Sequence, residues 1–211
     1  MTMYAHDLSV ARYRSFDSYR LALSDGVTVL AGPNAAGKTN LIEALQLLTS
    51  GASFRHPTAA ELVRDGVGSC KVELRLEGDG RVLDMGLSVE DGKRSFSRNG
   101  KRCAASGVRG VLPSVLFCPD HLDMVKRGAI ERRTALDDFG VQLSARYADL
   151  ASAYGRCVSQ RNALLKETWC CREMLGAWNE SLARAGSALL VHRLALLDRL
   201  SGHVCDAYGR V

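Results

Sequence analysis

The stretch "AGPNAAGKTN" at residues 31–40 decides how the first half of this chain is expected to fold. Its middle follows the pattern G-x-x-x-x-G-K-[ST], in which a tight glycine-rich path turns successive backbone N–H groups toward a phosphate. Lys38 would place an ammonium group on the β- and γ-phosphates, and the Thr39 hydroxyl could ligate Mg²⁺. The pattern predicts that a nucleoside triphosphate is held by Gly32, Pro33, Asn34, Ala35, Ala36, Gly37, Lys38 and Thr39.

The residues on both sides of this loop provide the context that the motif requires. "VTVLAG" at residues 27–32 is a short apolar run ending in glycine, which predicts a buried strand that leads into the loop. "TNLIEALQLLTSG" at residues 39–51 has leucine and isoleucine at helical spacing and stops at Gly51, which predicts a helix. Thr58 and Glu61 stand in capping-box register, so a short second helix is expected there.

The hydrophobic period changes to two from Lys71 onward. Residues 71–103 alternate apolar and polar side chains and are interrupted by Gly-Asp-Gly, Asp-Gly and Asn-Gly, which favour tight hairpins. Residues 4–10 and 19–23 have the character of two further strands. The first half is therefore predicted to be an α/β unit that carries an antiparallel β meander.

The second half of the chain has a helical pattern. One more buried strand is expected within "LPSVLFCPDHL" at residues 112–122, after which apolar residues recur at helical spacing. Two amphipathic faces predict a helical hairpin or a short coiled-coil arm. The first face contains Tyr147, Leu150, Tyr154, Val158 and Leu165, and the second contains Leu175, Trp178, Leu182, Ala185, Leu189 and Leu196. We therefore expect a nucleotide-binding lobe at residues 1–113 and a helical lobe or arm at residues 114–211.

The composition is that of an ordinary globular protein and restricts the function only loosely. The 211 residues are 46% hydrophobic and carry a net charge of +5, which is compatible with a polyanionic partner without selecting one. Seven cysteines, an odd number, form no C-x-x-C pair and have no zinc-ligand spacing, so reduced thiols are expected. The N-terminus has charges and no apolar run, and no segment is long and apolar enough for a membrane span. A cytoplasmic protein without a membrane partner is expected.

Several segments resemble those of known ATPases. Gly-Pro-Asn within the loop and Thr-Asn after its lysine are similar to the ABC-type ATPases of DNA maintenance, the SMC and RecF group. "LSVARYRSF" (residues 8–16), "SGASFRH" (50–56) and "FSRNGKR" (96–102) resemble RecF segments in the same order. The most specific similarity lies in "VLFCPDHLDMVKRGAIERRTALDDF" (115–139) and "YADLASAYGRCVSQRNALLKE" (147–167).

The resemblance to the RecF family has implications for fold and function. It implies an incomplete P-loop ABC-ATPase-type head of α/β class, with an antiparallel β meander and a helical second lobe or arm. It also implies ATP and Mg²⁺ as cofactors, and an ATP-dependent clamp on single-stranded or gapped duplex DNA in recombinational repair. The implied partners are DNA, recombination mediator proteins and a second copy of the chain in an ATP-dependent homodimer.

Two elements of such ATPases are not found in these 211 residues. The family continues with a Leu-Ser-x-Gly signature loop and an apolar strand that ends in two acidic residues. "ALDDFG" at residues 135–140 imitates that strand, but the residues before it are charged and helical in pattern. Background ATP turnover is therefore expected, and a truncated or regulatory nucleotide-binding module without hydrolysis remains the alternative. A P-loop small-molecule kinase would need an acceptor-binding element, which the sequence does not offer.

Several charged residues are candidates for function, each with a simpler structural alternative. The resemblance implies that Arg55 directs a catalytic guanidinium at the γ-phosphate, whereas a structural ion pair is the alternative. Arg14 is a similar candidate for contact with nucleotide or DNA. Asp120 could sense Mg²⁺ or couple the lobes, although capping a helix is the simpler role.

Two basic clusters are candidates for contact with the DNA backbone. The first cluster comprises Arg94, Arg98, Lys101 and Arg102, and the second comprises Lys126, Arg127, Arg132 and Arg133. Such clusters suit phosphate contacts that do not read bases, but a solvated surface has the same appearance. For Arg132 and Arg133 we also consider a structural role, in which they tie the lobes together through carboxylates such as Asp137.

Overall fold

The computed structural model describes residues 3–126, 128–167 and 172–210, and only the backbone of residues 120, 121, 123 and 172. The chain forms two compact units, Met1–Leu116 and Phe117–Val211, and each is described by itself. The division falls within a coil segment at residues 113–118.

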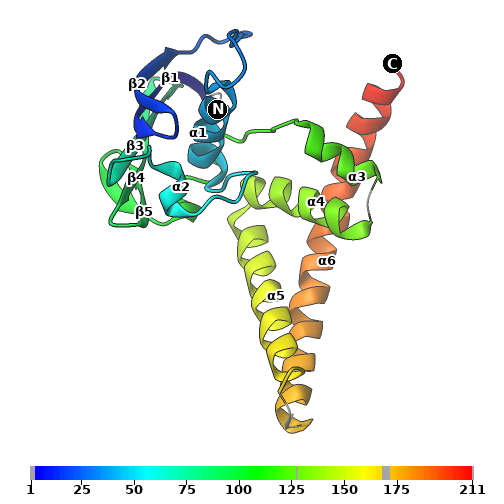
Figure 1. Ribbon diagram of the computed structural model, residues 1–211. Helices are drawn as coiled ribbons and strands as arrows, with labels where there is room; N and C mark the ends of the chain where they lie inside the picture. Colours follow the sequence, from blue (N-terminus) through cyan, green and yellow to red (C-terminus); the bar gives the residue numbers. More distant parts are fainter. Residues whose placement is uncertain (1–2, 127, 168–171, 211) are drawn as a thin grey trace. The chain divides into compact units, whose positions relative to one another are not determined.

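The first unit is built on a six-stranded antiparallel sheet of order β2-β1-β3-β4-β5-β6 (Figure 1). Its strands are β1 (Tyr4–Tyr13), β2 (Phe16–Ala22), β3 (Ser69–Gly78), β4 (Arg81–Glu90), β5 (Lys93–Arg98) and β6 (Lys101–Cys103). Asp79, Asp91 and Asn99 have φ values of 51°, 49° and 49° at the hairpin turns, as the Asp-Gly and Asn-Gly pairs predict. The predicted α/β fold class and meander are confirmed.

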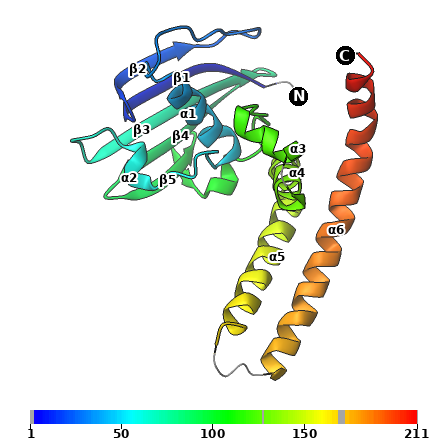
Figure 2. The same cartoon turned by 45° about the vertical axis from the view of Figure 1, so that its right-hand side comes forward.

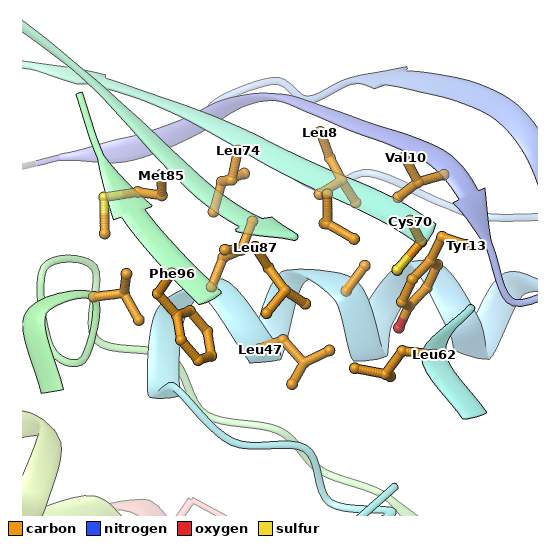
Figure 3. Packing of buried hydrophobic residues seen from close by; sticks show 14 of the residues in the cluster. Leu8, Val10, Tyr13, Leu47, Leu62, Cys70, Leu74, Met85, Leu87 and Phe96 are labelled. Carbon is orange, nitrogen blue, oxygen red and sulfur yellow. The ribbon is translucent and has the colours of Figure 1, made fainter. Parts of the chain in front are cut away.

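Helix α1 (Lys38–Ser50) packs on one face of this sheet and closes the core (Figure 3). Alternate residues of β1, β3 and β4 point toward it, so Leu8, Leu74 and Leu87 are at most 1% exposed, while Leu47 of the helix is fully buried. The helix ends at Gly51, whose φ is 73° and whose N–H donates to Leu47 O, as the sequence predicts.

Two short helical elements complete the first unit. Helix α2 (Ala59–Leu62) begins with the predicted capping box between Thr58 and Glu61. The 3₁₀ turn η1 (Ala105–Gly107) follows β6 and leads into a segment beside the end of α1, where the N–H of Gly110 donates to Thr49 O at 3.1 Å.

Two predicted strands are wrong. Residues 27–32 and 112–118 contain no strand, and Val27, Val29, Val115 and Phe117 are 79–89% exposed. Apolar runs of this kind become strands only when a neighbouring strand accepts their backbone hydrogen bonds. Within the described residues, neither segment pairs with any of the six strands.

The second unit is helical, as predicted. It contains η2 (Pro119–Leu122), α3 (Asp123–Lys126), α4 (Ala129–Leu143), α5 (Ala145–Leu164) and α6 (Arg172–Tyr208). Helices α5 and α6 run side by side as a hairpin (Figure 2), and both predicted faces turn inward, with Tyr147, Leu189 and Leu196 buried. One position differs, because Leu164 is the buried residue at the end of α5 and Leu165 is 49% exposed.

An ion pair joins helices α4 and α6 of this unit. Arg193 of α6 donates to both carboxylate oxygens of Asp137 on α4, at 2.9 and 2.6 Å, and the Tyr147 hydroxyl donates to the same group at 2.6 Å. The hydrogen bonds described at Asp137 therefore come from Arg193 and Tyr147, and the expected pairing with Arg132 or Arg133 is not among them. Among the described helices, none is long and apolar enough to cross a bilayer.

Candidate nucleotide-binding site

The glycine-rich loop has the backbone path that a phosphate cradle requires. Gly37, which precedes α1, has φ 91°, and Ala35 has φ 66°, so the chain turns twice through the left-handed region. A Cβ atom on Gly37 would lie 2.5 Å from the ring of Phe16 and 2.9 Å from the Ser15 hydroxyl. Both the conformation and this close approach therefore require glycine at position 37.

The start of α1 presents several unused hydrogen-bond donors. Within the described part of the chain, the backbone N–H groups of Gly37, Lys38 and Thr39 have no acceptor, whereas those of Asn40 and Leu41 donate to Gly37 O. These amides form the N-terminal end of a 13-residue helix, where the peptide dipoles add a positive potential. Residues 31–36 are exposed, so an anion has open access to this end of the helix.

Lys38 supplies a full positive charge at the same place. Its ammonium Nζ lies 2.8 Å from both Gly32 O and Pro33 O, which holds the side chain folded over the loop. A phosphate in the cradle would offer this ammonium group a charge-assisted hydrogen bond in place of two neutral carbonyls. Lys38 and the loop amides therefore fit a polyphosphate.

Thr39 is the residue that could hold a metal ion with that phosphate. Its side chain is exposed at the mouth of the loop, and a hydroxyl oxygen is a suitable ligand for Mg²⁺. No group of three or more His, Cys, Asp or Glu residues is placed to bind a metal in the described residues. Mg²⁺ at this site would therefore depend on Thr39 and on phosphate oxygens.

A buried carboxylate lies beneath the loop, one helical turn after Thr39. Glu43 of α1 is completely buried and receives Arg14 Nε and Nη2 at 3.0 and 2.9 Å, Ser53 Oγ at 2.7 Å and the Tyr13 hydroxyl at 3.2 Å. Burial alone would raise the pKa of Glu43, but hydrogen bonds from Arg14 and Ser53 outweigh it and hold the pKa below its usual value. Arg14 therefore has a structural role in this network.

Arg55 connects the buried network to the loop. Its Nη1 lies 3.6 Å from Glu43 Oε2 and donates to Asn40 Oδ1 at 2.9 Å, while Asn40 Nδ2 donates to Ser15 Oγ at 3.2 Å. Asn40 directly follows Thr39, so the Arg55 guanidinium is held at the rim of the loop. The structural ion pair considered from the sequence is present, and it places Arg55 on the side where a nucleotide would bind.

The other candidate residues are only partly brought together. Arg94 donates to the Pro57 carbonyl, whereas Arg98, Lys101 and Arg102 lie at the end of the β5–β6 hairpin, where Arg98 pairs with Lys101. In the second unit, Lys126 belongs to α3 and Arg132 and Arg133 belong to α4. Arg127 and the side chain of Asp120 lie outside the described residues.

Reasoning from the sequence missed Glu43 and the ring of Phe16. The signal for Glu43 was present, because a carboxylate that lies on the same helical face as Leu47 interrupts an apolar stripe. A charge in that position requires partners, and Arg14 and Tyr13 come from a strand about 30 positions earlier.

A loop with this sequence and geometry, at the start of a helix packed on a sheet, defines a P-loop nucleotide-binding lobe. A protein-family model described as an AAA domain matches residues 7–110. The curated "DNA replication and repair protein RecF" of Paenarthrobacter aurescens (strain TC1) is 36% identical over 217 residues, covering 99% of this chain and 54% of the relative. The RecF protein of Kineococcus radiotolerans is 37% identical over 218 residues, covering 99% of this chain and 56% of the relative.

Solved structures agree with these relatives. The "recombination mediator protein RecF-ATPrS in RecFOR pathway" matches with a TM-score of 0.87 and 28% identity, covering 94% of this chain and 55% of that one. The corresponding RecF-ATP structure matches with a TM-score of 0.84 and the same coverage. The chain belongs to the RecF family of DNA replication and repair proteins. It spans about half the length of the curated relatives that it matches.

Proposed function

We propose that this chain is an ATP-binding component of recombinational DNA repair, with ATP held on residues 32–39 and Mg²⁺ on Thr39. The observation that supports this most directly is the set of unused amides at Gly37, Lys38 and Thr39 beside the Lys38 ammonium group. Similarity to RecF proteins over 99% of the chain supports ATP among the nucleotides, since a matched solved structure is titled RecF-ATP.

We assign Arg55 as the residue that contacts the terminal phosphate. Its link to Glu43 is 3.6 Å long, compared with two contacts of 3.0 Å or less for Arg14. Arg55 is also the more exposed of the two, with 38% of its side chain accessible compared with 19% for Arg14. Arg55 can therefore leave its carboxylate for a phosphate at a smaller energetic cost, while Arg14 remains bound to Glu43.

The substrate and partners follow from the family. The proposed ligand is single-stranded or gapped duplex DNA, enclosed when ATP brings two copies of the head together, with recombination mediator proteins as further partners in the cytoplasm. The words "DNA replication and repair" and "RecFOR pathway" describe the relatives and support this role. The net charge of +5 is compatible with a polyanionic ligand.

A nucleotide-dependent module without hydrolysis is the second candidate. The acidic pair Asp137-Asp138 lies on helix α4, and Asp137 is bound by Arg193 and Tyr147. This pair therefore does not form the acidic strand that an ATPase of this type uses to hold Mg²⁺ and orient water. We expect phosphate release by this chain alone at background level, and several turnovers per minute that Lys38→Ala abolishes would refute this expectation.

The proposed function is tested by the effect of nucleotide on DNA binding. Fluorescence anisotropy with a labelled gapped duplex should show tighter binding when Mg²⁺ and a slowly hydrolysed ATP analogue are added. A coupling of about fivefold or more is expected, within the usual range for linked sites. Lys38→Ala should remove the effect of nucleotide and leave nucleotide-free DNA binding unchanged. A wild-type chain that binds no gapped or single-stranded DNA, with or without nucleotide, would contradict the proposal.

A further inference from the structure

A cavity with three arginines opens at the end of α1 opposite the nucleotide loop. We call it the cationic hollow; its volume is about 730 Å³, and it is lined by Asp79, Arg81, Arg98, Arg109, Val111 and Leu112 among others. Arg109 Nε donates to Ser50 O at the last turn of α1, whereas the loop is at the first turn. A helix of 13 residues is roughly 20 Å long, so the two sites are separate.

The arginines of the hollow differ from Arg20, Lys71 and Arg75 of the same sheet, which have carboxylate partners. Arg75 pairs with Asp84 at 3.0 Å, Lys71 with Glu73 at 2.7 Å, and Arg20 with Asp7 at 2.7 Å. Over the described ranges, no ion pair is formed by Arg81, Arg98, Lys101, Arg102 or Arg109. One carboxylate, Asp79, lines the hollow with the three arginines, so its net charge is positive.

The hairpin beside the hollow adds Lys101 on the same face of the sheet as Arg98, while Arg102 lies on the opposite face. Arg98 at the end of β5 pairs in register with Lys101 of β6, and the neighbouring register pair is Ser97 with Arg102. All three basic residues are exposed. In Figure 3, Phe96 and Met85 occupy the end of the core away from Tyr13 and Leu62, so this hairpin belongs to the end of the sheet remote from the Glu43 network.

We propose that the cationic hollow and this hairpin bind the phosphodiester backbone of DNA. Guanidinium groups form paired hydrogen bonds with phosphate oxygens, and several of them around one concave surface suit a chain of phosphates. Among the described residues, no aromatic side chain on which a base could stack lines the hollow, so the contact is with the backbone and is independent of sequence. This inference rests on the proposed function, and it adds Arg81 and Arg109 to the predicted cluster while removing Arg94.

Two double variants with the same change in charge test the proposal. Arg81→Gln with Arg98→Gln removes two cations of the hollow, whereas Lys71→Gln with Arg75→Gln removes two cations that already have carboxylate partners. The affinity of the full chain for a fluorescent single strand is measured across a range of salt concentrations. Arg81→Gln with Arg98→Gln should weaken DNA binding at least about tenfold at low salt. It should also reduce the slope of log affinity against log salt concentration by roughly 1.4, or 0.7 for each lost phosphate contact. The second pair should change affinity by less than about twofold.

The outcomes separate this inference from the proposed function. If both double variants weaken DNA binding equally, the effect is one of general charge. If Arg81→Gln with Arg98→Gln leaves DNA binding unaffected, DNA binds elsewhere on the chain. Either result overturns this inference and leaves the proposed function standing. A wild-type chain that binds no DNA overturns the DNA-binding part of the proposed function as well. Polyglutamate that competes with DNA, with the same dependence on Arg81 and Arg98, would assign the hollow to an acidic protein. Unchanged binding of a fluorescent ATP analogue verifies that both variants are folded.

Discussion

Arg14 and Glu43 form a bidentate salt bridge beneath the nucleotide loop, with Nε–Oε2 and Nη2–Oε1 distances of 3.0 and 2.9 Å. The contact joins the end of strand β1 to helix α1, and Tyr13 and Ser53 complete the shell around the carboxylate. Because Glu43 has no exposed surface, its charge is stable only with these partners in place. The start of α1, which carries the loop, depends on this network for its position.

Removal of the carboxylate should therefore be strongly destabilising. We expect Glu43→Ala to lower the free energy of unfolding by about 3–5 kcal/mol, since it leaves Arg14 without its partner in a buried site. Glu73→Ala on the exposed face of β3 is the control and should cost less than about 1 kcal/mol. Urea denaturation followed by circular dichroism measures both values. Equal stability losses for the two variants would contradict the structural role of Glu43.

The same carboxylate predicts how stability depends on acid. The pKa values of Glu43 and Asp137 are lowered in the folded chain; burial opposes this shift, but hydrogen bonds from Arg14 and Arg193, respectively, outweigh it. Both groups therefore contribute stability above the ordinary carboxyl pKa of about 4, and that stability is lost as the pH falls through their lowered values. Thermal melting should be constant near neutral pH and should fall below about pH 4. Stability that rises with acidification would contradict the assignment.

Alkaline conditions test two buried hydroxyls. Burial, followed by the neighbouring carboxylates, raises the pKa values of Tyr13 and Tyr147 above their ordinary value. Their contribution is complete below the unfolded pKa of about 10 and is lost as the pH rises toward the folded values. Thermal stability should therefore decline above about pH 10, and the double variant Tyr13→Phe with Tyr147→Phe should show a shallower decline. Identical alkaline slopes would show that other groups cause the loss.

The nucleotide loop contains one non-glycine residue in a left-handed conformation, which permits a test of its backbone. Ala35 has φ 66°, a conformation that costs an L-residue about 1–2 kcal/mol, whereas Ala36 is not in this region. We expect Ala35→Gly to raise stability by up to about 1 kcal/mol after the entropy of glycine is included. Ala36→Gly should lower it by about 0.5–1 kcal/mol. If thermal melting shows that Ala36→Gly is more stable than Ala35→Gly, the loop backbone does not have the conformation described here.

Close packing in the helical unit allows a similar comparison. A Cβ atom on Gly140 of α4 would lie 2.6 Å from the buried ring of Tyr147, whereas one on Gly155 of α5 would meet nothing within 4 Å. Gly140→Ala should therefore destabilise the unit by about 1–3 kcal/mol through overpacking. Gly155→Ala should stabilise it by up to about 1 kcal/mol through helix propensity. If both variants stabilise the protein, α4 and α5 do not pack as described.

Local patterns predicted most of the fold, because the signals for its elements lie within a few residues. The Asp-Gly and Asn-Gly turns defined the meander, and α1 ends at Gly51 as expected. The strands predicted at residues 27–32 and 112–118 are wrong because a strand depends on a partner that hydrophobic period alone does not identify.

The candidate site shows the same division between local and long-range information. The loop was predicted because its pattern is contiguous, whereas the partners of Glu43 are 10 to 30 residues away along the chain. Arg94, close in sequence to Arg98, binds the Pro57 carbonyl, and Arg81 reaches the cationic hollow from another strand. Neighbourhood in sequence was therefore a poor guide to which basic residues act together.

The most direct test of the central claim is isothermal titration of the chain with Mg-ATP. Lys38→Ala should weaken binding at least about tenfold, because the charge-assisted contact to phosphate is lost while the fold remains intact. Lys71→Ala, which removes a lysine paired with Glu73 on the sheet, is the control and should bind as the wild type does. Wild-type affinity in the Lys38→Ala variant, or no measurable binding of Mg-ATP by the wild-type chain, would contradict the assignment of residues 32–39 as the nucleotide site.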